Sequence, residues 1–222
     1  MINFTPGEQT LVFTACFLAL GGSIWFFDLK SMMLRDTSTA AKKPYSFARV
    51  QLAWWTVIVL SSFITIMITR HYIPTLDSST LILLGISAAT TGIARVIDQG
   101  DLNNPSIVRG QDANSQGILL DILSDNTGPN LQRFQTVLFN AVFGIYFIVT
   151  VIHNLPTEPV DIIMPVITTN NLILIGLSSG TYAALKTTEN KPGPAMADTV
   201  PDESLQPGQG AAQTPAQGPA QG

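Results

Sequence analysis

The chain has 222 residues, of which 46% are hydrophobic and only 12% are charged, with 11 Lys and Arg against 15 Asp and Glu. This balance is typical of a membrane protein and excludes a soluble domain of ordinary composition. The net charge of −4 gives no support for a nucleic-acid partner. The single cysteine, Cys16, excludes an internal disulfide and is expected to be a small apolar residue inside a helix rather than a lipidation site.

Five uncharged apolar stretches predict membrane-spanning helices, because about 20 mostly apolar residues cross a hydrocarbon core of about 30 Å. These stretches are 9–27, 50–69, 78–94, 134–157 and 162–185. Pro165 interrupts the last of them, so its helix is expected to start near Asn170 and Asn171. The first stretch has no preceding basic residue and no cleavage pattern, which favours a retained helix over a signal peptide. The sequence therefore predicts an all-α integral membrane bundle of five transmembrane helices.

The basic residues orient this predicted bundle. Ten of the eleven Lys and Arg residues fall on one side of it, and only Arg70 falls on the other. Because loops rich in Lys and Arg stay in the cytoplasm, the N-terminus is expected outside and the C-terminus in the cytoplasm.

Two stretches of the chain repeat one pattern. Each opens on Arg-x-Gln, closes on Gly-[Ile/Leu]-Ser-[Ala/Ser]-x-Thr, and has a basic residue ten positions after the glycine. The pattern predicts a duplicated helical hairpin in which both copies share one orientation, related by a pseudo-twofold axis along the membrane normal. The corresponding residues are Arg49 and Arg133, Gln51 and Gln135, Gly85 and Gly176, and Arg95 and Lys186.

This organisation divides the chain into five segments. They are an external N-terminus with the first helix and a basic loop (1–48), the first hairpin (49–98), a cytoplasmic loop (99–132), the second hairpin (133–189) and a tail (190–222). The loop is expected to hold a short amphipathic helix over 117–124, lying against the headgroups or the ends of the bundle. The Pro, Gly, Gln and Ala-rich tail is expected to be disordered, either without a role or as a tether for a cytoplasmic partner.

The third and fifth apolar stretches carry small residues at corresponding positions. Small residues let helices approach closely in a bilayer, so we expect packing within one subunit, an oligomer contact or a pore lining. These residues are Gly85, Ala88, Ala89, Gly92, Gly176, Ser179, Gly180 and Ala183. Hydroxyls that can bond across helices or line a polar path accompany them, at Ser87, Thr90, Thr91, Ser178 and Thr181.

The residues at the predicted cytoplasmic interface have two interpretations. They anchor the helices by reaching lipid phosphates, or they tie a hairpin to the carbonyl end of a neighbouring helix or to a partner protein. They are Arg49, Gln51, Arg133, Gln135, Arg95 and Lys186. Trp54 and Trp55, close to one end of the second stretch, are expected at the interface as well.

The sequence favours no catalytic residue, metal or cofactor. Residues 176–180 match G-x-S-x-G, but that motif needs a strand, a tight turn and a helix, and here it lies within a predicted membrane helix. The histidines, His71 and His153, are expected at external helix ends, where a base would not easily reach Ser178. The acidic residues of the 99–132 loop lack EF-hand spacing. No predicted span has a central charged residue, which argues against a proton-coupled transporter.

With its Arg-x-Gln openings and its Gly-Ile-Ser-Ala-Ala-Thr and Gly-Leu-Ser-Ser-Gly-Thr-Tyr closings, the part 46–186 resembles a group of uncharacterised bacterial multi-pass inner-membrane proteins. The resemblance implies a bacterial membrane and carries no activity. The sequence favours a non-enzymatic scaffold or anchor that self-associates and presents its loops and tail to a cytoplasmic protein. The alternative is an oligomeric channel or small-solute pathway lined by the hydroxyls of the third and fifth stretches.

Overall fold

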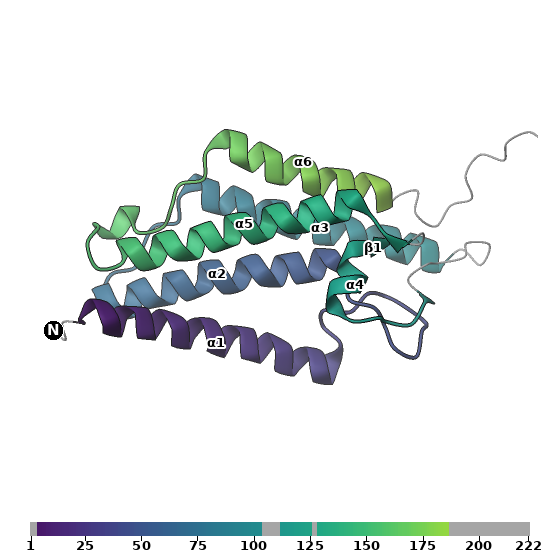
Figure 1. Ribbon diagram of the computed structural model, residues 1–222, viewed down its shortest axis with the longest axis horizontal. Helices are drawn as coiled ribbons and strands as arrows, with labels where there is room; N and C mark the ends of the chain where they lie inside the picture. Colours follow the sequence, from purple (N-terminus) through teal and green to yellow (C-terminus); the bar gives the residue numbers. More distant parts are fainter. Residues whose placement is uncertain (1–3, 104–111, 126–127, 187–222) are drawn as a thin grey trace, which may run out of the picture. The chain divides into compact units, whose positions relative to one another are not determined.

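The computed structural model describes residues 4–103, 112–125 and 128–186, which form helices joined by short connections (Figure 1). The long helices are α1 (Pro6–Ser31), α2 (Phe47–Arg70), α3 (Ser78–Leu102), α5 (Leu131–Asn154) and α6 (Thr169–Lys186). The short elements are α4 (Ile118–Leu123), the 3-10 turn η2 (Val160–Ile162), and the antiparallel strands β1 (Ser124–Asp125) and β2 (Gly128–Pro129).

Four of the long helices, α1, α2, α3 and α5, are long and apolar enough to cross a membrane. The structure therefore confirms a helical bundle and supports four of the five predicted spans. The fifth stretch contains the end of η2, a connection and α6. Helix α6 starts after Pro165, as predicted, but it has only 18 residues and polar residues at both ends, and it is not among the four candidate spans.

Local sequence signals fix where these helices begin. Thr5 and Glu8 form a capping box at the start of α1, where each side chain bonds the other's backbone N–H. At the start of α3, the Asp77 carboxylate accepts a hydrogen bond from the Ser79 N–H at 2.7 Å. At the start of α5, the Asn130 side-chain oxygen accepts one from the Gln132 N–H at 2.8 Å. These caps satisfy N–H groups that have no partner within the helix.

The two hairpins lie side by side and share a direction. In Figure 1, α1, α3 and α6 run away from the end marked N, while α2 and α5 run back toward it. Helix α2 packs against α5, and α3 packs against α6, so each helix of one hairpin touches its counterpart in the other. A twofold axis parallel to the helices would place counterparts on opposite sides of the axis. Only the pair nearest the axis could then be in contact. This arrangement therefore differs from the twofold relation expected from the sequence and is that of one hairpin translated beside the other.

The main core lies between α2, α3, α5 and α6. Its fully buried side chains include Trp55, Ile58, Leu83, Phe147 and Ile175. Helix α1 is peripheral, since it packs mainly against α2 and only 6% of the residues in its most apolar 18-residue segment are buried. The core is thus formed mainly by the two hairpins, with Phe13 as its buried side chain from α1.

A smaller apolar cluster closes the end of the bundle at which α1 finishes. It joins the connections before α2 and before α5 to the helices, through Leu34, Tyr45, Phe47, Ala48, Ala94 and Ile122. This cluster supports the polar site described next.

Candidate functional site at the basic end of the bundle

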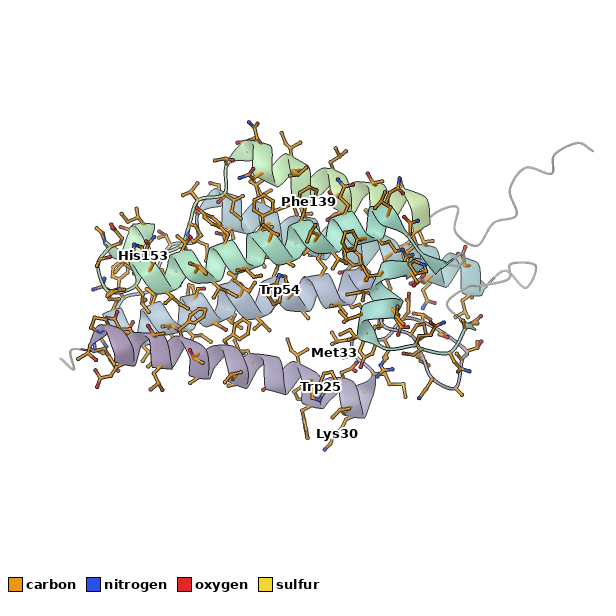
Figure 2. All side chains as sticks on the ribbon, viewed as in Figure 1. Trp25, Lys30, Met33, Trp54, Phe139 and His153 are labelled. Carbon is orange, nitrogen blue, oxygen red and sulfur yellow. The ribbon has the colours of Figure 1, made fainter. Side chains whose placement is uncertain are left out.

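All of the described Lys and Arg residues except Arg70 lie at one end of the bundle, which we call the basic end. It comprises the last turns of α1, α3 and α6, the first turns of α2 and α5, and the connections between them. Arg70, the last residue of α2, lies at the opposite end. Figure 2 shows Lys30 at the basic end and His153 at the opposite end. Two further predicted members of this group, Arg109 and Lys191, lie outside the described residues.

Two connections fold over the basic end and together form what we call the cap, residues 32–46, 112–125 and 128–130. The Asp112 carboxylate accepts hydrogen bonds from the Thr39 N–H at 2.7 Å and the Ser38 hydroxyl at 3.3 Å. The Lys42 N–H donates to the Asn114 side-chain oxygen at 3.1 Å, and the Lys42 carbonyl accepts from the Ser115 N–H at 2.9 Å. These bonds join residues 72 to 74 positions apart, so the cap is a folded element rather than two separate loops.

Asp121 of α4 joins the two connections. Its carboxylate accepts from the Tyr45 N–H at 3.0 Å, the Ser115 hydroxyl at 2.6 Å and the Gln116 N–H at 2.9 Å. Helix α4 lies within the stretch 117–124 and packs against α2 and α5, at the end of the bundle. The carboxylate is fully engaged in holding backbone and hydroxyl groups.

A second carboxylate organises the connection that follows α1. Asp28 is buried, accepts the Leu34 N–H at 2.8 Å and pairs with Arg35 Nε at 3.5 Å. Arg35 also donates to the Lys43 carbonyl at 2.9 Å and to the Tyr45 hydroxyl at 2.8 Å, and its guanidinium lies 3.9 Å from the Tyr45 ring centroid. Burial raises the pKa of Tyr45, so its phenol stays neutral at physiological pH.

The last residue of α6, Lys186, is buried between two carboxylates. Its Nζ lies 2.9 Å from Asp98 Oδ1 of α3 and 3.4 Å from Asp36 Oδ2 of the cap. Burial acts to raise the pKa of Asp36, but Lys186, hydrogen bonds and Arg49 together bring it below its ordinary value. Removing Lys186 would leave two buried carboxylates without its positive charge. The cluster therefore ties the end of α6 to α3 and to the cap.

A set of side chains inside the bundle, Gln51, Trp55, Asn140 and Ser179, forms what we call the amide node. Gln51 Nε2 of α2 donates to Asn140 Oδ1 of α5 at 3.1 Å and to Ser179 Oγ of α6 at 3.0 Å. Trp55 Nε1 donates to the same Asn140 Oδ1 at 2.8 Å. All four side chains are buried, so the node links three helices through polar contacts in the core.

Trp54 of α2 lies directly against Gly144 of α5. The Trp54 indole Nε1 donates to the Asn140 carbonyl at 3.1 Å, and Figure 2 shows Trp54 at the boundary of the two helices. A Cβ placed on Gly144 would lie 2.6 Å from Trp54 Cζ2 and 2.7 Å from Cε2, which real Cβ atoms do not tolerate. Only glycine at this position lets the indole reach the carbonyl.

The two arginines of the repeated motif make similar contacts, and the two glutamines do not. Arg49 donates to the carbonyls of Met33 and Arg35, and Arg133 donates to the Ser124 carbonyl at 2.6 Å. Both arginines thus hold the connection next to their helix. Gln51 belongs to the buried node, whereas Gln135 is exposed. The environments of Arg95 and Lys186 also differ, because Arg95 is exposed.

The small-residue faces of α3 and α6 have different surroundings. On α3, all four residues are exposed, namely Gly85, Ala88, Ala89 and Gly92. A Cβ added to either glycine would meet no atom within 4 Å. On α6, Ser179 and Ala183 are buried, Gly176 lies against Ile86 of α3, and Gly180 is exposed. The α6 face therefore packs largely inward, while the α3 face is left on the surface of the bundle.

The hydroxyls expected to line a polar path bond to their own helices. Each of Ser87, Thr90, Ser178 and Thr181 donates to the carbonyl four residues earlier. Thr91 donates to the Ser87 carbonyl and also to the Ala48 carbonyl of α2 at 3.0 Å. This back-bonding is the ordinary state of a hydroxyl in a helix.

The described contacts of the basic end are hydrogen bonds and ion pairs that join segments of the bundle. Within the described residues, no three His, Cys, Asp or Glu side chains are grouped to hold a metal ion. Ser178 lies nine residues into α6, about 14 Å along the helix at 1.5 Å per residue. His153 lies in the last turn of α5, at the end opposite the cap. Comparisons of the chain with known protein families, curated proteins and solved structures find no match.

Sequence reasoning missed the residues that carry most of this network. Asn140 is the one with a usable signal, since it is a polar residue in the middle of an apolar stretch, where such side chains bond across helices. No local pattern in the sequence indicates that Asp36 and Asp98 share a partner, because that partner, Lys186, is contributed by the distant helix α6. Trp55 was expected at the membrane interface, but it is fully buried and bonded to Asn140.

Proposed function

We propose that this chain is a non-enzymatic scaffold or anchor of a bacterial inner membrane, with the basic end and the C-terminus in the cytoplasm. The positive-inside rule supports this orientation, since all of the described Lys and Arg residues except Arg70 lie at that end. Helix α6 serves as a fifth span in this proposal: its 18 residues extend about 27 Å, close to the roughly 30 Å of the hydrocarbon core. Its position beside α3 and α5 supports that role.

The observation that carries the proposal is the cap. Its carboxylates, at Asp112 and Asp121, accept hydrogen bonds from backbone N–H groups and a hydroxyl of distant segments. Such a network fixes the shape of a surface at the end of the bundle. Large apolar side chains are exposed on or beside that surface, at Leu119, Leu120 and Leu131. A fixed surface with exposed apolar side chains suits recognition by a partner protein.

Self-association is the second part of the proposal. The α3 face formed by Gly85, Ala88, Ala89 and Gly92 is exposed, and its glycines have open space around them. In a bilayer, such a face allows the backbone of another helix to approach closely. We assign it to contact with a second copy of the chain.

The alternative function is an oligomeric channel or small-solute pathway. The same exposed α3 face favours it, because copies arranged around that face would enclose a path between them. A path through a single copy has no support, since Trp55, Ile58 and Phe147 fill the core and are fully buried. Flux into vesicles that disappears in Gly85→Leu while the oligomer persists would favour the channel.

Site-specific crosslinking tests the scaffold. A photoreactive amino acid at Leu119 of the cap should capture one cytoplasmic protein in cells, whereas the same group at the exposed Val142, midway along α5, should capture only lipid or another copy. Capture of one protein at Leu119 alone supports the scaffold. Equal products at the two positions would contradict a docking surface on the cap.

A further inference from the structure

The amide node has only one consistent arrangement of donors and acceptors. The Trp55 indole nitrogen can only donate, so the Asn140 atom that it contacts at 2.8 Å must be the oxygen. The Asn140 nitrogen then faces the Thr136 carbonyl, to which it donates at 2.8 Å. Gln51 contacts the same Asn140 oxygen at 3.1 Å and must therefore present its own nitrogen. Turning either amide by 180° would place two acceptors or two donors together.

This arrangement leaves one strong acceptor in the core. Gln51 Oε1 is buried and has no hydrogen-bond partner among the residues that the structure describes, and the whole residue is only 3% exposed. Both protons of the Gln51 amide are already donated, to Asn140 and to Ser179. The Ser179 hydroxyl accepts one of them and still carries a proton that it can donate. An acceptor and a donor therefore belong to adjacent groups of one buried site.

We propose that the amide node binds a water molecule, which donates to Gln51 Oε1 and accepts from the Ser179 hydroxyl. Water is the small molecule that offers both functions at once, and buried waters typically join polar groups that would otherwise lack a partner. A metal ion does not suit the site, because it could not accept the serine proton. The water would be held between α2 and α6, and this inference is independent of the scaffold proposal.

Solid-state NMR of the full chain, uniformly ¹⁵N-labelled in deuterated lipid bilayers, tests the inference through magnetisation transfer from water. The Gln51 side-chain amide is identified by its loss in Gln51→Met. It should receive magnetisation as early as the exposed Gln135 amide and earlier than the buried backbone amide of Phe147. After transfer to D₂O, the Gln51 amide should exchange more slowly than that of Gln135, because the bound water is enclosed.

The variant Ser179→Ala removes one of the two groups that hold the water. We expect the Gln51 transfer to fall to the level of the Phe147 amide, with an unchanged Trp55 indole shift showing that the node is still folded. Transfer to wild-type Gln51 no earlier than to Phe147 would overturn the proposal. Exchange at Gln51 as fast as at Gln135 would also overturn it, because the node would then be open to solvent.

Discussion

The contact between Trp54 and Gly144 gives the sharpest prediction for stability. In Gly144→Ala, the new methyl group would overlap the indole, with Cζ2 only 2.6 Å away. The ring must move, and the hydrogen bond from Trp54 Nε1 to the Asn140 carbonyl, now 3.1 Å, would be lost. The packing of α2 against α5 would loosen at this point.

The magnitude follows from three contributions. Overpacking costs about 1–3 kcal/mol, and the lost hydrogen bond costs about 0.5–1.5 kcal/mol. The higher helix propensity of alanine offsets up to about 1 kcal/mol. With the middle of each cost range and the full propensity offset, Gly144→Ala should lower the free energy of unfolding by about 2 kcal/mol, a factor of about 30 in the equilibrium constant.

The assay is equilibrium unfolding in mixed micelles, with two matched variants. Gly22→Ala adds the same methyl to a helix glycine of α1 with no atom within 4 Å of the new Cβ, so it should be neutral or slightly stabilising. In a Trp54→Leu background, Gly144→Ala should cost no more than Gly22→Ala, because the indole ring that the methyl would overlap is absent. Equal effects of Gly144→Ala and Gly22→Ala on the free energy of unfolding in the wild-type background would refute the reasoning.

Three further predictions concern the basic end. Lys186→Met leaves two carboxylates buried without their cation and should lower the free energy of unfolding by about 3–5 kcal/mol in the same assay. The control Arg95→Met, at an exposed side chain, should change that free energy by less than about 0.5 kcal/mol. Similar losses of stability in both variants would contradict a buried ion cluster. The folded pKa of Asp36 is below its ordinary 3.8, so its contribution to stability is present above that value and is lost as pH falls through the folded pKa. Asp36→Asn should therefore flatten the fall of unfolding free energy below about pH 4, and an unchanged acid profile would exclude this role. Arg49→Ala removes hydrogen bonds to two cap carbonyls and should speed backbone hydrogen exchange over 32–46, as measured by mass spectrometry. The control Lys42→Ala, which truncates an exposed side chain of the same segment, should leave that exchange unchanged.

Sequence reasoning succeeded where the signal is local. Apolar length alone predicts the four candidate spans, and the fixed backbone of Pro165 predicts the delayed start of α6. The apolar run over 117–124, bounded by glycine and turn residues, predicts a helix where α4 lies. None of these features depends on which helix lies next to which.

The contacts of the site depend on that arrangement and could not be predicted. Gln51 and Gln135 occupy the same place in the repeated motif, yet one is buried in a polar node and the other is exposed. Their environments differ because α2 lies inside the bundle between α1, α3 and α5, whereas α5 has fewer neighbours. Lys186 meets Asp36 across 150 positions, a pairing that no local pattern encodes.

The most direct test of the scaffold proposal is the mass of the complex, isolated gently from its native membrane into nanodiscs, with every co-purifying protein identified. The account predicts a stoichiometric protein partner that is lost in Leu119→Arg. The matched control Leu29→Arg, at an exposed leucine of α1 outside the cap, should retain the partner. A homo-oligomer of defined size without a partner, conducting ions or solutes in vesicles, would contradict the scaffold and establish the channel.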